Sequence, residues 1–120
     1  MSEIGIKRAY ESPAPDDGFR VLVDRIWPRG VKREEAKIDL WLKDVAPSTA
    51  LRKWFGHVPA KWPGFQDRYR AELAGNAALD DLLAAARQHR RVTLVFAAKD
   101  TEHNNAVVLQ ALCKHRLSHE

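Results

Sequence analysis

Two short runs of apolar and β-branched residues, 19–23 and 92–98, constrain the fold most strongly. Both are apolar at consecutive positions, which is typical of strands that are covered on both faces of a sheet. Much of the sequence between them has the periodicity of amphipathic helices. Because strands separated by helices predict an α/β layer fold, we expect a single compact domain with a small, mostly parallel sheet flanked by about four helices.

Local signals place the other elements. Residues 4–10 and 38–43 alternate between apolar and polar side chains, so we predict two further short strands, the first at an edge of the sheet. Helices are expected to begin at Ser48, near Pro63 and after Asn76. Ser and Asn side chains cap helix N-termini, and Pro fits the first helical turn.

Length and composition narrow the class of protein. The 120 residues fit one domain, which we place at 1–120 with its core at about 4–116. Lys and Arg outnumber Asp and Glu by 20 to 16, a mild excess that is compatible with an anionic ligand or with nucleic acid. The single cysteine, Cys113, excludes an internal disulfide and is predicted to be a small buried apolar residue.

Targeting signals are not evident in the sequence. The first residues have neither the basic nor the apolar region of a signal peptide, and no apolar run approaches the length of a membrane span. We therefore expect a cytoplasmic protein without membrane contact.

The most unusual polar segments of the chain directly follow its two best strands. Strand 19–23 leads into Asp24–Gly30, and strand 92–98 leads into Lys99–Asn105. In open parallel sheets, ligands bind beyond the carboxyl ends of the strands. If the two strands are parallel and close, both segments lie at one edge of the sheet and form a shared site.

An anion is the ligand that these segments favour. The second segment opens the last predicted helix, 102–116, where free backbone N–H groups and the helix dipole attract negative charge. Arg25, Arg29 and Lys99 could surround a phosphate or a carboxylate there, with the arginines donating paired hydrogen bonds. The sequence therefore predicts a phosphate-containing or other anionic small molecule as ligand.

A purely structural interpretation of the same residues stays open. Arg25 could pair with Asp24 or Asp100, and Asp100 or Thr101 could cap the last helix without contacting a ligand. His103 could act as a general acid or base near neutral pH, or it could simply face solvent.

The expected site residues follow from these patterns. Asn104 and Asn105 are poor helix formers that either bind a ligand or cap the helix, and Trp27 lies between two arginines, where it could stack on a ligand. The expected catalytic residues are His103 and Asp24, and the expected ligand-binding residues are Arg25, Trp27, Arg29, Arg52, Lys99, Asp100, Asn104 and Asn105. Since Asp100 and His103 supply at most two ligands, we expect no metal and no other cofactor.

An aromatic cluster has two interpretations. Trp54, Phe55, Trp62, Phe65 and Tyr69 could stack on nucleic-acid bases, but they recur at helical spacing. That spacing is what a helix–helix core requires, so we predict a core.

Four ordered segments resemble a known family. They are Arg20–Gly30, Trp41–Ser48, Leu51–His57 and Ala97–Ala106. They resemble the YeaO-like proteins of the domain-of-unknown-function 488 family over nearly the whole chain, roughly 4–113. The family usually has an acidic residue after the histidine of the third segment, where this chain has Val58, which argues against a catalytic role near His57. The resemblance implies a compact bacterial or archaeal cytoplasmic α/β domain and supplies no substrate.

Three functions are compatible with the sequence. The first is an enzyme for an anionic, nucleotide-like substrate, in which Arg25, Arg29, Arg52 and Lys99 bind charge while His103 or Asp24 moves protons. The second is a non-catalytic module that binds nucleic acid or a nucleotide, and the third is a protein-interaction domain. A deep pocket favours the first, a flat basic face the second and a large exposed apolar patch the third. The oligomeric state does not follow from the sequence.

Overall fold

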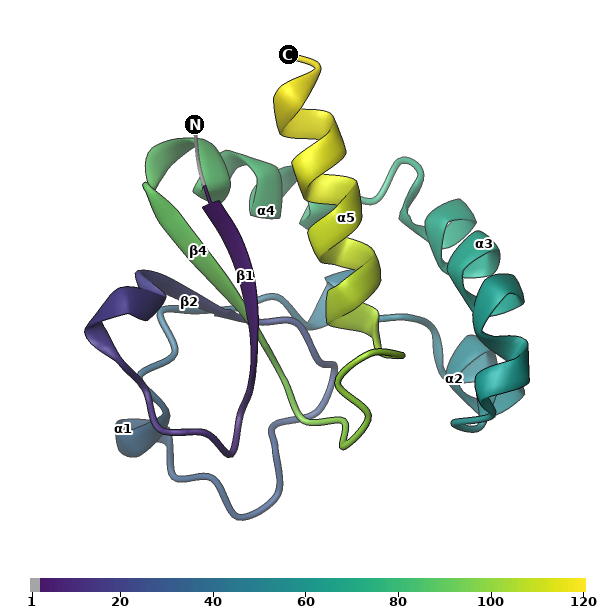
Figure 1. Ribbon diagram of the computed structural model, residues 1–120, viewed down its shortest axis with the longest axis horizontal. Helices are drawn as coiled ribbons and strands as arrows, with labels where there is room; N and C mark the ends of the chain where they lie inside the picture. Colours follow the sequence, from purple (N-terminus) through teal and green to yellow (C-terminus); the bar gives the residue numbers. More distant parts are fainter. Residues whose placement is uncertain (1–2) are drawn as a thin grey trace.

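The computed structural model describes residues 3–120 and contains a four-stranded sheet in the order β1-β4-β2-β3 (Figure 1). All neighbouring strands are parallel. The strands are β1 (Glu3–Arg8), β2 (Phe19–Leu22), β3 (Leu40–Trp41) and β4 (Arg91–Phe96). The predicted α/β fold with a small parallel sheet is confirmed. The strand predicted over 38–43 is present but reduced to the two residues of β3.

The two strands that the apolar runs predict lie next to each other in the middle of the sheet. β2 and β4 pair from Phe19 opposite Val92 to Leu22 opposite Val95. Every residue of β4 after Arg91 is buried. Because the strands are parallel, their carboxyl ends reach the same edge of the sheet. The segments that follow them are therefore neighbours in space, as predicted.

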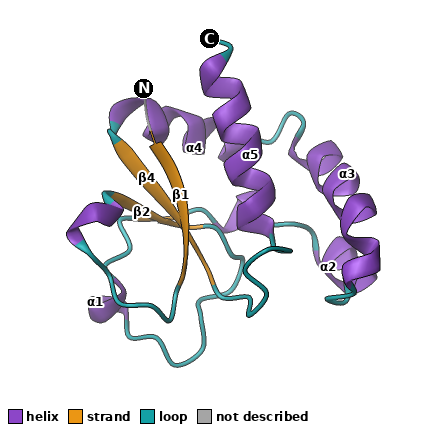
Figure 2. Ribbon diagram, in the orientation of Figure 1, coloured by secondary structure: helices purple, strands orange, loops and turns teal. Residues whose placement is uncertain are grey.

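Five helices accompany the sheet (Figure 2). They are α1 (Arg33–Ala36), α2 (Thr49–Phe55), α3 (Trp62–Leu73), α4 (Ala77–Gln88) and α5 (Asn105–Ser118). The predicted caps are confirmed, since the Ser48 hydroxyl accepts the Leu51 N–H at 3.1 Å and the Asn76 side chain accepts the Ala78 N–H at 2.7 Å. Between residues 3 and 120, no helix combines the length and the apolar character that a membrane crossing requires.

The last helix begins later than predicted. Its first residue is Asn105 rather than residue 102, and its cap is Asn104, whose side-chain oxygen accepts the Val107 N–H at 3.1 Å. Asp100 instead accepts two backbone N–H groups of a turn that precedes the helix. Several residues able to cap a helix follow one another here, and the one closest to the packed part of the helix forms the cap.

Alternate residues of the central strands pack on opposite faces of the sheet. Val21 and Leu94 join the larger core, which residues of α2, α3, α4 and α5 complete. Leu22 and Val95 face the other way into a smaller core. Side chains from the segment 27–41 close this second face, so a loop with one short helix takes the place of a helical layer.

The aromatic cluster is mostly core, as predicted. Phe55, Phe65 and Tyr69 are at most 6% exposed. Trp54 differs, because it is only half-buried on the outer side of α2. Cys113 is fully buried, and burial raises the pKa of its thiol to about 12, which confirms its prediction as a buried apolar residue.

Candidate functional site

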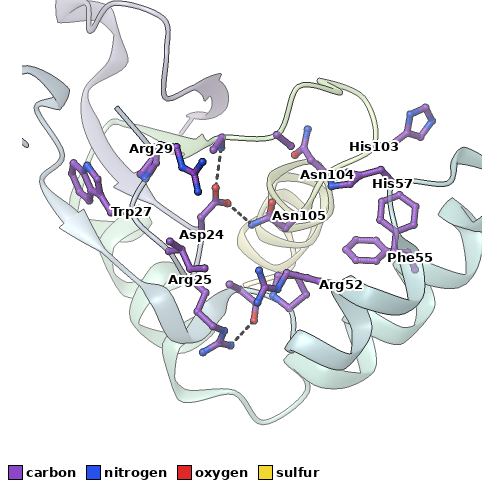
Figure 3. Close-up of a pocket in the computed structure, with 17 residues that line it drawn as sticks. Asp24, Arg25, Trp27, Arg29, Arg52, Phe55, His57, His103, Asn104 and Asn105 are labelled. Carbon is purple, nitrogen blue, oxygen red and sulfur yellow. Dashed lines mark hydrogen bonds between the residues drawn. The ribbon is translucent and has the colours of Figure 1, made fainter. Parts of the chain in front are cut away.

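A pocket of about 370 Å³ opens at the carboxyl ends of β2 and β4 (Figure 3). Segments that follow both strands line it, together with residues of α2 and α3. The lining consists of Asp24, Arg25, Ile26, Trp27, Pro28, Arg29, Ala46, Pro47, Arg52, Phe55, His57, Phe65, Ala97, Ala98, His103, Asn104 and Asn105. All of the residues that we expected at a shared site line this pocket, except Lys99 and Asp100.

Asp24 joins three elements at the middle of the lining (Figure 3). Its carboxylate accepts a hydrogen bond from the Ala97 backbone N–H at 2.9 Å and another from the Asn105 side-chain amide at 3.1 Å. The same amide donates to the Val23 carbonyl at 2.9 Å. The end of β2, the end of β4 and the start of α5 are therefore fixed relative to one another by one carboxylate and one amide.

The environment of Asp24 is unfavourable for its charge. Burial raises the pKa of this carboxyl above its ordinary value. The hydrogen bonds from Ala97 and Asn105 and the charge of Arg52 lower the pKa, but they do not outweigh the loss of solvation. A carboxyl group with a raised pKa in a pocket is a common feature of functional sites.

Arg25 has a structural role that differs from both expected pairings. Its guanidinium donates to the Ala46 carbonyl at 3.2 Å and lies 3.6 Å from the Asp44 carboxylate. The predicted pairing with Asp24 or Asp100 is therefore wrong. The Arg25 side chain leaves the loop toward the segment before α2, where Asp44 is the acidic group within its reach (Figure 3). Arg25 still lines the pocket, but with its charge partly matched.

Arg29 and Arg52 are not in close ion pairs in the described part of the chain. Neither side chain forms an ion pair within residues 3–120, and both are exposed. Arg52 donates one hydrogen bond to the Thr49 hydroxyl at 3.2 Å, one turn earlier in α2. These two guanidinium groups leave the pocket with more positive than negative charge, since Asp24 is the single acidic residue of the lining.

One wall of the pocket is apolar and aromatic. Phe55 and Phe65 line it with their rings 4.6 Å apart between centroids. His57 lies beside them, because Gly56 and His57 both adopt left-handed backbone angles, φ 53 and φ 58, that turn the chain sharply after α2. The helical spacing of the two phenylalanines predicted only a core position for them, and Val58 argued against a role for His57. The Leu51–His57 segment of the family resemblance was the signal for this wall.

The segment between β4 and α5 holds His103 away from Asp24. The His103 Nδ1 atom lies 2.9 Å from the Asp100 carboxylate, and its ring packs edge-on against Trp62 at 5.2 Å. In Figure 3 the ring points away from Asp24. Hydrogen bonds from the Glu102 backbone and from His103 lower the pKa of Asp100. His103 therefore connects this segment to α3 while lining the same pocket as Asp24.

Three other predicted ligand-binding residues either form hydrogen bonds within the protein or lie outside the pocket lining. Lys99 is exposed and lies outside the lining. Asn104 caps α5 with its oxygen and donates its amide to the Asp100 carbonyl at 2.8 Å. The Trp27 indole donates to the Val31 carbonyl at 2.7 Å and packs edge-on against Trp41, so it belongs to the smaller core and contributes only part of its surface to the pocket.

Comparison with known proteins identifies the family. Residues 3–120 match the family described as the inactive DUF488-N3 subclade. The uncharacterized protein YeaO of Escherichia coli K12 is 41% identical over 106 residues, which are 88% of this chain and 92% of the relative. Uncharacterized proteins of Mycobacterium tuberculosis H37Rv and Mycobacterium bovis are 41% identical over 115 residues, which are 96% of this chain and 97% of each relative.

No solved structure matches the chain. The family match spans the whole described chain, and the relatives align over almost their full lengths. The chain therefore belongs to the YeaO-like proteins of the domain-of-unknown-function 488 family, within the inactive DUF488-N3 subclade.

Proposed function

We propose that the pocket binds a small anionic ligand of the nucleotide type and does not convert it. The observation that carries this proposal is the combination, in one pocket, of two arginines that are not in close ion pairs and an aromatic wall. Arg29 and Arg52 supply charge-assisted donors for a phosphate group. Phe55 and Phe65 form an apolar wall of which only 6% and 3% of the residue surface is exposed, enough to contact the edge of a planar ring. A volume of about 370 Å³ suits a ligand of this size.

Asp24 supports a nitrogen-containing ring as part of the ligand. A carboxylate offers about four acceptor positions, of which hydrogen bonds from Ala97 and Asn105 use two. The remaining positions can accept N–H groups from the edge of a base. An aromatic wall, a carboxylate and two arginines then match the ring, the polar edge and the phosphate of a nucleotide.

Binding without conversion agrees best with the chemistry of the lining. None of the lining residues carries a hydroxyl, a thiol or an amine that could act as a nucleophile. His103, the expected acid or base, is directed toward Asp100 and Trp62. The description of the subclade as inactive favours the same interpretation. Of the functions that the sequence left open, the non-catalytic nucleotide module therefore has the strongest support.

Calorimetric titration tests this proposal. We expect mononucleotides to bind the wild-type protein and to bind Arg29→Ala and Arg52→Ala roughly tenfold to a hundredfold more weakly, the effect of losing a charge-assisted hydrogen bond. Arg70→Ala is the matched control, since Arg70 is exposed on α3 and lies outside the lining. Absence of binding at millimolar nucleotide, or an equal loss in the control, would overturn the proposal.

A further inference from the structure

The hairpin of α2 and α3 extends beyond the pocket that it helps to form. We define it as residues 49–73, which include both helices and the short turn Pro59–Lys61. In Figures 1 and 2 the two helices lie beside each other at one side of the molecule, away from the sheet. Phe55 and Phe65 face the pocket, and other residues of the same helices form an outer surface.

This hairpin carries more positive than negative charge. Its basic residues are Arg52, Lys53, Lys61, Arg68 and Arg70, and its acidic residues are Asp67 and Glu72. Glu72 is already engaged, since its carboxylate accepts hydrogen bonds from the Ser48 backbone and hydroxyl. Within residues 3–120, no ion pair involves any of the five basic side chains. Their charge is therefore available to an external anion.

Trp54 organises part of this surface. The Arg68 guanidinium lies over its ring at 4.0 Å from the centroid, and the Lys61 ammonium lies at 5.2 Å while donating to the Trp54 carbonyl. Gly64 lies beneath the indole, where a Cβ atom would come within 2.8 Å of the ring. The two cations are thus held on a fixed aromatic support. Because Arg68 covers the ring, Trp54 positions charge instead of stacking on a base.

We propose that this basic face binds the phosphate backbone of a single-stranded nucleic acid, one nucleotide of which occupies the pocket. The inference rests on the proposed function of the pocket. Arg52 belongs to both surfaces. Along α2 it is followed directly by Lys53 and by Trp54, whose ring lies under Lys61 and Arg68. A pocket of about 370 Å³ has room for one nucleotide, and a base could enter it only when unstacked, which favours a single strand over a duplex.

Fluorescence anisotropy with labelled octathymidylate and octauridylate tests the proposal. We expect the wild-type protein to bind one of these oligomers at least tenfold more tightly than the corresponding mononucleotide. Lys53→Gln combined with Arg68→Gln should remove about tenfold of the oligomer affinity and leave mononucleotide binding unchanged. The salt dependence should also fall, by about 1.4 in the slope of log K against log salt, because each lost phosphate contact contributes about 0.7.

Two controls separate this face from general electrostatic attraction. Arg90→Gln combined with Lys114→Gln removes the same charge at the amino-terminal end of the sheet and should change oligomer binding less than twofold. Lys53→Gln alone, at an exposed position of α2, gives a single-site variant whose fold is not in question. Equal losses in both double variants would overturn the proposal.

The outcomes distinguish this proposal from that for the pocket. If mononucleotides bind and oligomers bind no more tightly, the pocket function stands and the basic face has no role. If oligomers bind but Arg52→Ala and Arg29→Ala leave their affinity unchanged, the pocket does not hold a nucleotide of the strand and the proposal is refuted. If mononucleotides fail to bind at millimolar concentration, the proposed function itself fails.

Discussion

Replacing Asp24 by Asn should change stability little at neutral pH while removing recognition of the ligand ring. The carboxylate accepts two hydrogen bonds, which as charge-assisted bonds would contribute about 1.5–3 kcal/mol each. Its raised pKa nevertheless shows that burial opposes ionisation more strongly than these bonds favour it. Asn removes the buried charge and keeps one acceptor oxygen. One donor, from Ala97 or Asn105, then loses its acceptor at a cost of about 1–3 kcal/mol, and removal of the buried charge offsets part of this cost. We therefore expect Asp24→Asn to lie within about 2 kcal/mol of wild type at pH 7.

The same variant has a defined pH dependence. The folded-state pKa of Asp24 lies above the ordinary aspartate value of 3.8, so the folded state binds the proton more tightly than the unfolded state does. The stabilisation from protonating Asp24 is complete below the unfolded pKa and is lost as pH rises through the folded pKa. Wild type should therefore gain stability relative to Asp24→Asn between pH 7 and pH 4, as measured by urea unfolding at each pH.

Two control variants make this prediction specific. Asp81→Asn, which removes one charge from an exposed position of α4, is the control for the change in net charge. Asp24→Ala removes both acceptor oxygens and leaves the Ala97 N–H and the Asn105 amide without an acceptor. Since each such donor costs about 1–3 kcal/mol, this variant should be destabilised by roughly 2–6 kcal/mol. A loss of 3 kcal/mol or more for Asp24→Asn at pH 7, or the opposite pH trend, would refute the reasoning. In calorimetry, Asp24→Asn should bind inorganic phosphate as wild type does and nucleotides more weakly.

Two further predictions follow from side chains around the pocket. Phe65→Ala should destabilise by about 3–5 kcal/mol in denaturant melts, as for other buried aromatic truncations, while Trp54→Ala should lose clearly less because Trp54 is half-buried; equal losses would contradict the assigned burial. Arg25→Ala should destabilise by less than about 1 kcal/mol and weaken nucleotide binding less than Arg52→Ala does, since its partner Asp44 is 87% exposed; calorimetry and melts on both variants would reveal the reverse order.

Local sequence signals predicted much of the fold. The consecutive apolar residues of 19–23 and 92–98 predicted two central strands, because few other segments could be buried on both faces. The structure places these strands side by side and parallel. Ser48 and Asn76 marked helix starts, since each is a strong cap next to a helical pattern. These successes share a cause: the information lies within a few residues of the feature that it specifies.

The features that were not predicted depend on which of several chemically similar side chains forms a given cap or ion pair. Asp100, Thr101 and Asn104 can all cap a helix, and only packing of α5 against the sheet selects Asn104. Arg25 could pair with any nearby carboxylate, and the path of the loop selects Asp44. The sequence indicated the edge of the sheet at which the pocket lies, but the aromatic wall required knowing how α2 and α3 fold back over that edge.

The contacts that hold the hairpin of α2 and α3 in place determine whether the pocket is formed before a ligand binds. On one side, the Tyr69 hydroxyl donates to the Val45 carbonyl at 2.5 Å; on the other, Trp62 packs against His103 at 5.2 Å. The part of the lining around Asp24 is held separately from the hairpin, because Asp24 joins both central strands to α5. Because these contacts hold both the hairpin and the residues around Asp24, the pocket is formed before a ligand binds. Binding does not require these elements to become ordered. Preformed sites lose less conformational entropy on binding, so affinity here should depend on the contacts of Arg29 and Arg52 and not on closure of the hairpin.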